Sequence, residues 1–547
     1  MLAVLSALPI IVAIVLMVGF KQKSGISLVA AWFVSIMLAV FVWNMGIGHA
    51  GAFTVLGFLS AVNVILIVFS AIFLLNALIE LRFIETIGNG FNGITQDRRI
   101  QILIIAWLFG ALIEGASGFG TPGALAAPLL VGLGVPTFFA ALASLMANYP
   151  PVSFGVVGIP PVTGFNSIRS GLEAQYGEVM TEGIFSELTV MAGFTNIFVG
   201  SFVPFLIIAA IVARDGRKRG LKDAVNIMPL CLFSGFIFTI PTWLISFLGP
   251  ELPTLLGSLI ALPVFIFAVK KGFLVPKEVY RFQDDPVSLP EDSEGTGISL
   301  ITAWSPYVII AVLLAVSRLP WLPFVRWFTQ SGATISVSGL FGYEGINWNW
   351  PILNNPGLLP FLPVALIFLI ARKTSKEAIS KTFTKTLKQL KNAVLALLFG
   401  VALVQIMRFT NYTHPGAGPE AMTTEIARTL ASAFGGIYPL IGPLIGSLGA
   451  FVSGSHTVSN VMFYGLQWEA AEFLGLPVVL VLLGQTSGAS IGNMVAIHNA
   501  VSISATTGAT GSEGKMIAAA FLPFILCILA VALILFIYLA LGINWVA

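Results

Sequence analysis

The chain has 547 residues, of which 57% are hydrophobic and only 9% are charged, and its formal net charge is +3. Soluble globular proteins carry about 25% charged residues, so this composition excludes a soluble enzyme, a disordered chain and a nucleic-acid binder. Its two cysteines, Cys231 and Cys527, lie in separate apolar runs and form neither a disulfide framework nor a metal-ligand pattern. The sequence therefore indicates a polytopic protein whose surroundings are the lipid bilayer.

A membrane-spanning helix needs about 20 apolar residues, and many such runs follow one another along the chain. We predict spans near residues 2–20, 25–45, 54–81, 187–213, 224–247, 252–269, 299–317, 356–371, 392–409 and 515–541. Two long stretches, about 100–165 and 421–512, are also apolar but are interrupted by Gly, Pro, Ser and Thr. The sequence thus predicts an all-α fold that contains two broken segments.

Basic residues gather in three short segments, 214–222, 270–281 and 372–391, which hold 16 of the 27 Lys and Arg residues. Short loops rich in Lys and Arg stay on the cytoplasmic side, so this distribution predicts that both termini are external. The polar stretch 270–297 is typical of a cytoplasmic linker. The basic stretch 373–391 has the amphipathic pattern of a helix lying in the membrane interface.

The two interrupted stretches resemble each other. Five residues of the first recur in the second at a constant offset of 336. They are Gly110, Leu112, Ser117, Gly118 and Thr121, which match Gly446, Leu448, Ser453, Gly454 and Thr457. Downstream, 133–136 matches 474–477, and Asn148 falls opposite Asn493.

Upstream of these matches, Arg82-Phe83 corresponds to Arg408-Phe409, and the predicted topology places the two arginines on opposite sides of the membrane. We therefore expect two inverted-topology repeats, residues 1–215 and 299–547. Residues 216–298 would supply two connecting helices and the cytoplasmic linker. Many secondary transporters build a midplane site from such repeats, with broken helices or re-entrant hairpins at the repeat interface.

The first broken segment carries four glycines and a proline within residues 115–123, which cannot continue a helix comfortably. Free N–H groups at a half-helix start, together with Ser and Thr hydroxyls, suit a small anion, although small residues can also serve tight helix packing. Further breaks are expected at 148–151 and 485–488. The predicted substrate-binding residues are Ser117, Gly118, Gly120, Thr121, Asn148, Ser453, Gly454, Ser455, Thr457, Ser487, Gly488 and Asn493.

Two titratable residues lie inside these motifs. Glu114 is an ionisable residue within an apolar run, and burial would favour its protonated form, so it could carry a proton or could act as a structural clamp. His456 can titrate near neutral pH but could equally be a satisfied neutral imidazole. No metal ligand set is present, and the G-x-G-x-x-G pattern beginning at Gly118 lacks a preceding strand. We therefore expect no metal and no cofactor.

The run from Gly110 to Gly134 closely resembles the signature of bacterial L-lactate permeases, and so does the run from Ala147 to Gly155. That resemblance implies a proton-coupled importer of lactate, glycolate and related 2-hydroxy monocarboxylates in the bacterial inner membrane, with no protein partner evident. It also places Glu114, the 117–121 motif and Asn148 in the transport path.

The second half departs from the family pattern at three places. His456 stands where the family has Asp, Asn493 stands where it has Lys, and Gln485-Thr486-Ser487-Gly488 replaces an Asn-Ser-Ser-Gly run. Losing one charge of each sign keeps the site electroneutral, so the chain reads as a divergent member. A sodium-coupled transporter of carboxylates or other small anions and an anion channel remain alternatives. A membrane enzyme is disfavoured, because no H-E-x-x-H or G-x-S-x-G motif is present.

Overall fold

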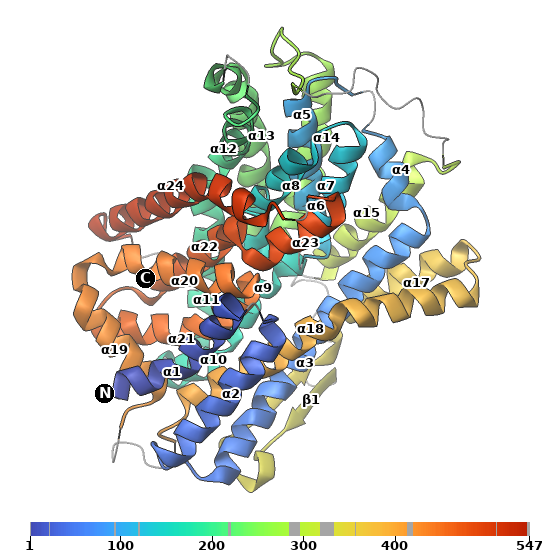
Figure 1. Ribbon diagram of the computed structural model, residues 1–547. Helices are drawn as coiled ribbons and strands as arrows, with labels where there is room; N and C mark the ends of the chain where they lie inside the picture. Colours follow the sequence, from blue (N-terminus) through green and yellow to red (C-terminus); the bar gives the residue numbers. More distant parts are fainter. Residues whose placement is uncertain are drawn as a thin grey trace.

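The computed structural model describes residues 2–20, 22–91, 94–118, 121–216, 220–283, 296–317, 333–355, 357–412, 419–509 and 511–543. Within these ranges ten helices are long and apolar enough to cross a membrane (Figure 1). An eleventh span results if the bent pair Thr137–Met146 and Pro151–Asn166, which meet at 49°, counts as one. The predicted all-α polytopic architecture is confirmed.

The elements before residue 217 are helices of very different length. They are α1 (Leu2–Ile14) continued by the π-helical η1 (Val15–Gly19), α2 (Ser24–Phe41), α3 (Ile47–Glu80), α4 (Phe83–Asn89), α5 (Arg98–Ile102), the π-helical η2 (Leu103–Phe109), α6 (Gly110–Ala116), α7 (Thr121–Gly132), α8 (Thr137–Met146), η3 (Pro151–Phe154), α9 (Gly155–Asn166), α10 (Arg169–Tyr176), α11 (Glu178–Phe198), η4 (Gly200–Phe202) and α12 (Val203–Val212).

The later elements include one short hairpin. They are α13 (Leu221–Ser246), α14 (Pro253–Lys270), α15 (Leu300–Ser317), β1 (Thr334–Val337), η6 (Leu340–Gly342), β2 (Trp348–Pro351), η7 (Ile352–Asn354), η8 (Gly357–Phe361), α17 (Leu362–Ala371), α18 (Lys376–Arg408), α19 (Met422–Phe434), η9 (Gly435–Ile437), α20 (Tyr438–Ser453), α21 (His456–Leu474), α22 (Val478–Gly492), η10 (Asn493–Val495), α23 (Ile497–Thr507) and α24 (Glu513–Ala540).

A helix lies at each of the ten predicted spans, but the prediction of a separate interfacial helix at 373–391 is wrong. These residues form the first half of α18, which continues without a break to Arg408. They pack along α3, where Asn76 Nδ2 donates to Thr386 Oγ1 at 3.0 Å and to Gln389 Oε1 at 2.7 Å. The basic residues thus occupy the outward face of a long helix that belongs to the bundle.

The core of the molecule contains the two helical runs that carry the predicted site. In the most apolar window of Arg98–Ala116 every residue is buried, and 94% of the window in Val478–Ser504 is buried, against 44% for α24. On α24 the side chains of Leu522, Leu526 and Leu529 are exposed at helical spacing, as expected for a face covered by lipid. The broken segments therefore lie inside protein, where irregular backbone is tolerated.

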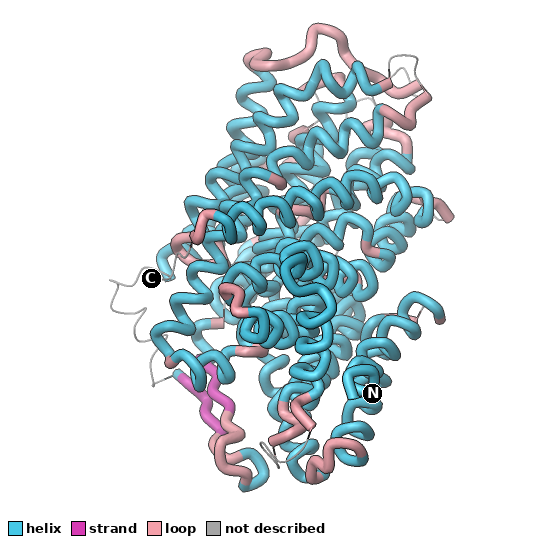
Figure 2. The backbone as a smooth tube through the Cα atoms, turned by 90° about the vertical axis from the view of Figure 1, so that its left-hand side faces the viewer, coloured by secondary structure: helices cyan, strands magenta, loops and turns pink. Residues whose placement is uncertain are grey.

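One feature not predicted from the sequence is a β-hairpin at one end of the helical body (Figure 2). Strands β1 and β2 pair antiparallel, with Thr334 opposite Pro351 and Val337 opposite Trp348. The hairpin is attached to α3, because Trp350 Nε1 donates to Asn63 Oδ1 at 2.8 Å. The basic segments at α5, α13 and the end of α14 lie at the opposite end of the molecule (Figure 1).

The two broken stretches also share a turn. The matched Leu-Gly-x-Pro runs both connect two helices, with Gly134 and Gly475 in left-handed conformation at φ values of 96° and 64°. Pro136 and Pro477 then occupy the N-cap positions of α8 and α22. Local backbone geometry thus repeats between the stretches, whereas the inverted topology and the boundaries near 215 and 299 stay predictions.

Candidate functional site

The first break separates α6 from α7 at Ser117 and Gly118. Ser117 Oγ donates to the carbonyl of Ile113 at 3.0 Å, and Gly118 has a φ of +49°. A Cβ on Gly118 would lie 2.0 Å from Val156 Cγ2 and 3.1 Å from Glu114 Oε1, so only glycine fits here. Gly120 and the side chain of Thr121, both predicted site residues, lie outside the described part of the chain.

The second break separates α20 from α21 at Ser453 and Gly454, and it repeats the geometry of the first. Ser453 Oγ donates to the carbonyl of Gly449 at 2.7 Å, and Gly454 has a φ of +71°. Ser455 caps α21, since its Oγ accepts from Val458 N at 3.3 Å. Each break thus consists of a serine bonded to the carbonyl four residues earlier, followed by a left-handed glycine.

Between the breaks runs one irregular segment, residues 151–158, which we call the crossing segment. Val156 has a φ of 46° and a ψ of 54°, and Val157 has a φ of 54° and a ψ of 45°. Both residues, like Gly158, are therefore in the left-handed conformation. For β-branched residues this conformation is a genuine outlier that costs about 1–3 kcal/mol each.

The crossing segment is held from three other elements. Thr254 Oγ1 donates to the carbonyl of Pro151 at 2.8 Å, Asn196 Nδ2 donates to Ser153 Oγ at 3.2 Å, and Ser490 Oγ lies 2.9 Å from Ser153 Oγ. Because these contacts come from both halves of the chain, the surroundings keep this backbone in its strained shape.

Glu114 lies on one side of the crossing segment. It is buried, with 2% of its surface exposed, and its Oε2 has no hydrogen-bond partner among the described residues. Its Oε1 lies against Gly155, where a Cβ would come within 2.4 Å of it. The carboxyl group thus fills the space left by two glycines, Gly118 and Gly155, without a bonded partner for Oε2.

His456 lies on the other side of the crossing segment. Its Nδ1 is 3.1 Å from the carbonyl of Val152, and its Nε2 is 3.0 Å from Asn460 Nδ2. The amide orientation of Asn460 is fixed because Nδ2 also donates to the carbonyl of Pro160 at 3.2 Å. A carbonyl only accepts, so Nδ1 carries the proton, and Nε2 accepts from the amide. His456 is therefore a neutral imidazole with both nitrogens bonded.

Behind His456 lies a buried polar network that the sequence reasoning missed. Tyr438 Oη donates to Gln467 Oε1, Gln467 Nε2 donates to Gln485 Oε1, and Gln485 Nε2 donates to Ser459 Oγ, at 3.0 to 3.1 Å. The signal was available, because His456, Ser459/Asn460 and Gln467 recur at helical spacing along one face of α21.

The predicted break at 485–488 is wrong, since α22 is continuous from Val478 to Gly492. Its glycines instead form a flat face against α20: a Cβ on Gly488 would lie 2.0 Å from the carbonyl of Pro443, and one on Gly492 would lie 2.5 Å from that of Ser447. Such spacing lets two helix backbones approach closely. The helix turns only at Asn493.

The remaining predicted residues are placed as follows. Thr457 is buried on the first turn of α21, and Ser487 is buried within α22. Asn148 is half-buried and ends α8, where its carbonyl accepts from Val152 N at 3.0 Å. Asn493 Nδ2 donates to the carbonyl of Ala489 at 3.0 Å, and its Oδ1 accepts from Asn499 at 3.2 Å. Of these, Asn148 borders the crossing segment and Thr457 borders the second break.

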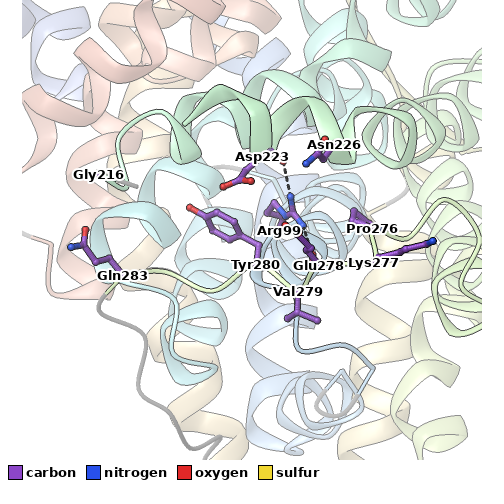
Figure 3. Close-up of a pocket in the computed structure, with 10 residues that line it drawn as sticks. All are labelled: Arg99, Gly216, Asp223, Asn226, Pro276, Lys277, Glu278, Val279, Tyr280 and Gln283. Carbon is purple, nitrogen blue, oxygen red and sulfur yellow. Dashed lines mark hydrogen bonds between the residues drawn. The ribbon is translucent and has the colours of Figure 1, made fainter. Parts of the chain in front are cut away.

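One cavity, of about 870 Å³, lies away from the breaks, between α5, the start of α13 and residues 276–283 (Figure 3). Arg99 is central to it but is fully engaged: it donates to Asp97 Oδ2 at 2.6 Å, to the Asp223 carbonyl at 2.6 Å and to the Glu278 carbonyl at 3.2 Å. Tyr280 Oη donates to Asp215 Oδ2 at 2.6 Å. These contacts form an ionic clasp that fastens the linker.

A second cavity, of about 590 Å³, lies beside the hairpin, and the sequence analysis did not predict it. Its walls come from α3, α9, α10, α18 and β2, and they include Asn63, Thr163 and Gln405. Val157 of the crossing segment also lines it. The sequence signal was weak: Asn63 and Gln405 are single polar residues within otherwise apolar spans.

Comparison with known proteins gives a consistent result. The model of the family described as L-lactate permease matches residues 2–542. The chain is 29% identical over 545 residues to the putative L-lactate permease of Haemophilus influenzae, covering 96% of each chain. It is 29% identical to the glycolate permease GlcA of Escherichia coli K12, covering 94% of this chain and 91% of that one.

Among solved structures, the chain matches the YdaH transporter of Alcanivorax borkumensis at 11% identity and a TM-score of 0.41. This match covers 87% of this chain and 85% of that one.

Proposed function

Because the chain belongs to the L-lactate permease family, and so is a multi-pass bacterial membrane transporter rather than an enzyme, we propose that it imports L-lactate, glycolate and related 2-hydroxy monocarboxylates by proton symport. The relatives named as L-lactate and glycolate permeases supply the substrate class. The proposed location is the bacterial inner membrane, with both termini external.

A proton is the natural partner of this substrate. A 2-hydroxy monocarboxylate is an anion at neutral pH, and an interior-negative potential opposes its entry by about 2.3 kcal/mol per charge per 100 mV. Carrying one proton with each anion makes the cycle electroneutral. The pH gradient then drives accumulation.

Glu114 is the proposed proton carrier, and its buried carboxyl group is the feature that best supports coupling of transport to protons. It is a buried carboxyl group whose Oε2 has no partner among the described residues, and it lies three residues before the first break. His456 is less suited to this role, because protonation would set its Nε2–H against the Asn460 amide. We assign His456 the role of fixing the second break.

The substrate is proposed to bind between the two breaks. Donors for its carboxylate come from the N-terminal ends of α7 and α21 and from the hydroxyls of Ser455 and Thr457, since Ser117 Oγ already donates its hydrogen to the Ile113 carbonyl. Gly118 and Gly454 supply the left-handed turns that precede these helix N-termini. Asn148 borders the crossing segment, and Asn493 stays a proposed member of the site.

The test is uptake of labelled L-lactate and glycolate into proteoliposomes with an inward proton gradient and no sodium. We expect uphill accumulation that an uncoupler abolishes. Dependence on sodium, tested by exchanging choline for sodium, would instead identify a sodium-coupled transporter. Saturation-free flux without accumulation would identify an anion channel.

The variant Glu114→Gln tests the coupling role. It should lose uphill accumulation but keep exchange of external for internal L-lactate, because only the proton-dependent step is removed. Glu469→Gln is a matched control, since the Oε2 of Glu469 also has no hydrogen-bond partner among the described residues. Glu469 is half-buried, and its Oε1 accepts from Thr423 Oγ1, away from the breaks. Unchanged uphill uptake in Glu114→Gln would overturn its role.

A further inference from the structure

The cavity beside the hairpin is lined by buried polar side chains. Thr163 and Gln405 line it, and they are only 6% and 7% exposed. Thr163 Oγ1 has no hydrogen-bond partner among the described residues, and the Gln405 amide lines the same cavity. Buried polar groups are nearly always bonded to protein, water or ligand. These two side chains are therefore suited to receive a polar molecule.

At Thr163 and Gln405 the chemistry of the walls fits a small hydroxy acid. The charged lining residues are Arg169, Glu173, Glu182 and Glu251, and Arg169 is paired with Glu173 and Glu182. The amide of Gln405 offers a donor and an acceptor, and the hydroxyl of Thr163 can act as either. A 2-hydroxy monocarboxylate presents a carboxylate that accepts and a hydroxyl that both donates and accepts. A cavity of about 590 Å³ lies within the size range of small-molecule sites.

The crossing segment separates this cavity from Glu114. Val157 lines the cavity, whereas Gly155, two residues earlier, lies against the Glu114 carboxyl, and Val156 fills the space beside Gly118. One stretch of strained backbone is thus the partition between the cavity and the first break. Only the crossing segment would then lie between a ligand in the cavity and Glu114, the proposed proton carrier.

The opposite wall of the cavity is firmly built. Trp350 lines it and is bonded to Asn63, whose Oδ1 also accepts from Asn355 Nδ2 at 2.7 Å. Arg408 lies one turn beyond Gln405 on α18, and its guanidinium donates to the carbonyl of Ser167, another lining residue. Of the lining elements, α3, α10 and α18 are labelled in the lower half of Figure 1, near β1, the strand that pairs with β2.

We propose that this cavity is an outer substrate site, in which Thr163 and Gln405 bind the 2-hydroxy monocarboxylate before it passes the crossing segment. The inference rests on the proposed function for its substrate class. The distribution of basic residues predicts that the hairpin end is external, so the site would be the first that an imported molecule meets.

Kinetics in right-side-out vesicles test this site. Thr163→Val and Gln405→Leu should each raise the external L-lactate concentration for half-maximal uptake by about fivefold, the loss of one hydrogen bond. They should leave the proton-driven accumulation ratio unchanged. Thr163→Ser should restore the wild-type value. Thr189→Val is the matched control, since the Thr189 hydroxyl is buried but bonded to the Phe185 carbonyl of its own helix.

A second measurement does not depend on transport. Asn166→Cys places a thiol at an exposed lining position, while both native cysteines are buried. A membrane-impermeant thiol reagent added from outside should label this cysteine. L-lactate should slow the labelling in proportion to the fraction of sites occupied. The same protection is expected when the Glu114→Gln substitution is also present.

These outcomes separate the two proposals. A wild-type protein that takes up neither L-lactate nor glycolate overturns the proposed function. A protein that transports L-lactate, but whose half-maximal concentration is unchanged in both Thr163→Val and Gln405→Leu, overturns the outer site alone. Labelling of Asn166→Cys that L-lactate does not slow overturns it as well.

Discussion

The two breaks share a backbone but differ in what surrounds it. In both, a serine bonds to the carbonyl four residues earlier and a left-handed glycine follows. Beside the first break, the Oε2 of Glu114 has no bonded partner among the described residues. Beside the second, both ring nitrogens of His456 are bonded and a polar network extends behind it. One copy of the motif thus has a carboxyl oxygen without a bonded partner among the described residues, whereas the other uses its polar groups for support.

The largest expected effect tests what the breaks share. Gly118→Ala and Gly454→Ala should each lower stability by about 2–4 kcal/mol, because the left-handed backbone disfavours alanine and the new Cβ would meet Val156 or His498. Thermal unfolding in detergent measures this. Gly132→Ala is the control, since nothing lies within 4 Å of a Cβ there. Tolerance at either break would show that the shared geometry is dispensable.

The next prediction tests how the breaks differ. His456→Leu should destabilise the protein by about 2–3 kcal/mol, because it leaves the Val152 carbonyl and the Asn460 amide unpaired. Glu114→Leu should change stability by less than about 1 kcal/mol, since Oε2 loses no partner. The melting temperatures of the two variants, each compared with wild type, measure this difference in stability. Equal destabilisation would contradict the contrast between an available and a fully bonded group.

The smallest effects concern the matched arginines, Arg82 and Arg408. Arg408 is buried, donates to Ser167 and stacks on Trp468, so Arg408→Gln should cost about 1–2 kcal/mol. Arg82 is exposed and forms an ion pair with Glu85 at 2.7 Å. Arg82→Gln should cost less than about 1 kcal/mol.

The Arg82 effect should depend on pH. The hydrogen bond from Arg82, and then its charge, hold the pKa of Glu85 below its ordinary value. This stabilisation is present above the ordinary pKa of a glutamate and is lost as the pH falls through the folded-state value. Arg82→Gln should therefore differ from wild type near pH 7 and match it in strong acid. A difference that persists in acid would contradict the ion pair as its cause.

Much of the fold follows from local sequence, because apolar length and Gly-Pro interruptions act within one or two helical turns. The spans and the Ser-Gly breaks are of this kind. The break at 485–488 was predicted wrongly, because a glycine that interrupts a helix cannot be told from sequence apart from one, such as Gly488, that packs its helix against Pro443. The continuity of α18 was missed because its basic half is held by Asn76, more than 300 residues away.

The site was predictable to a lesser extent. Glu114 and His456 stand out as polar residues in apolar motifs, but their different bonding depends on Val152 and Asn460, which the fold brings to His456 alone. The cavity beside the hairpin combines Asn63, Thr163 and Gln405 from three distant helices. No local pattern links such residues, so only the packed structure reveals them.

The ionic clasp has a consequence for the membrane voltage. Elements α5, η2 and α6 run on from Arg98 to Ala116, so the helix that Arg99 fastens to the linker is the one that carries Glu114. Fifteen residues separate the two, about 22 Å along a helix axis. Glu114 is thereby tethered at a set distance from the linker. The proposal that it carries a proton implies that the electrical distance of proton transfer depends on which aqueous side reaches it.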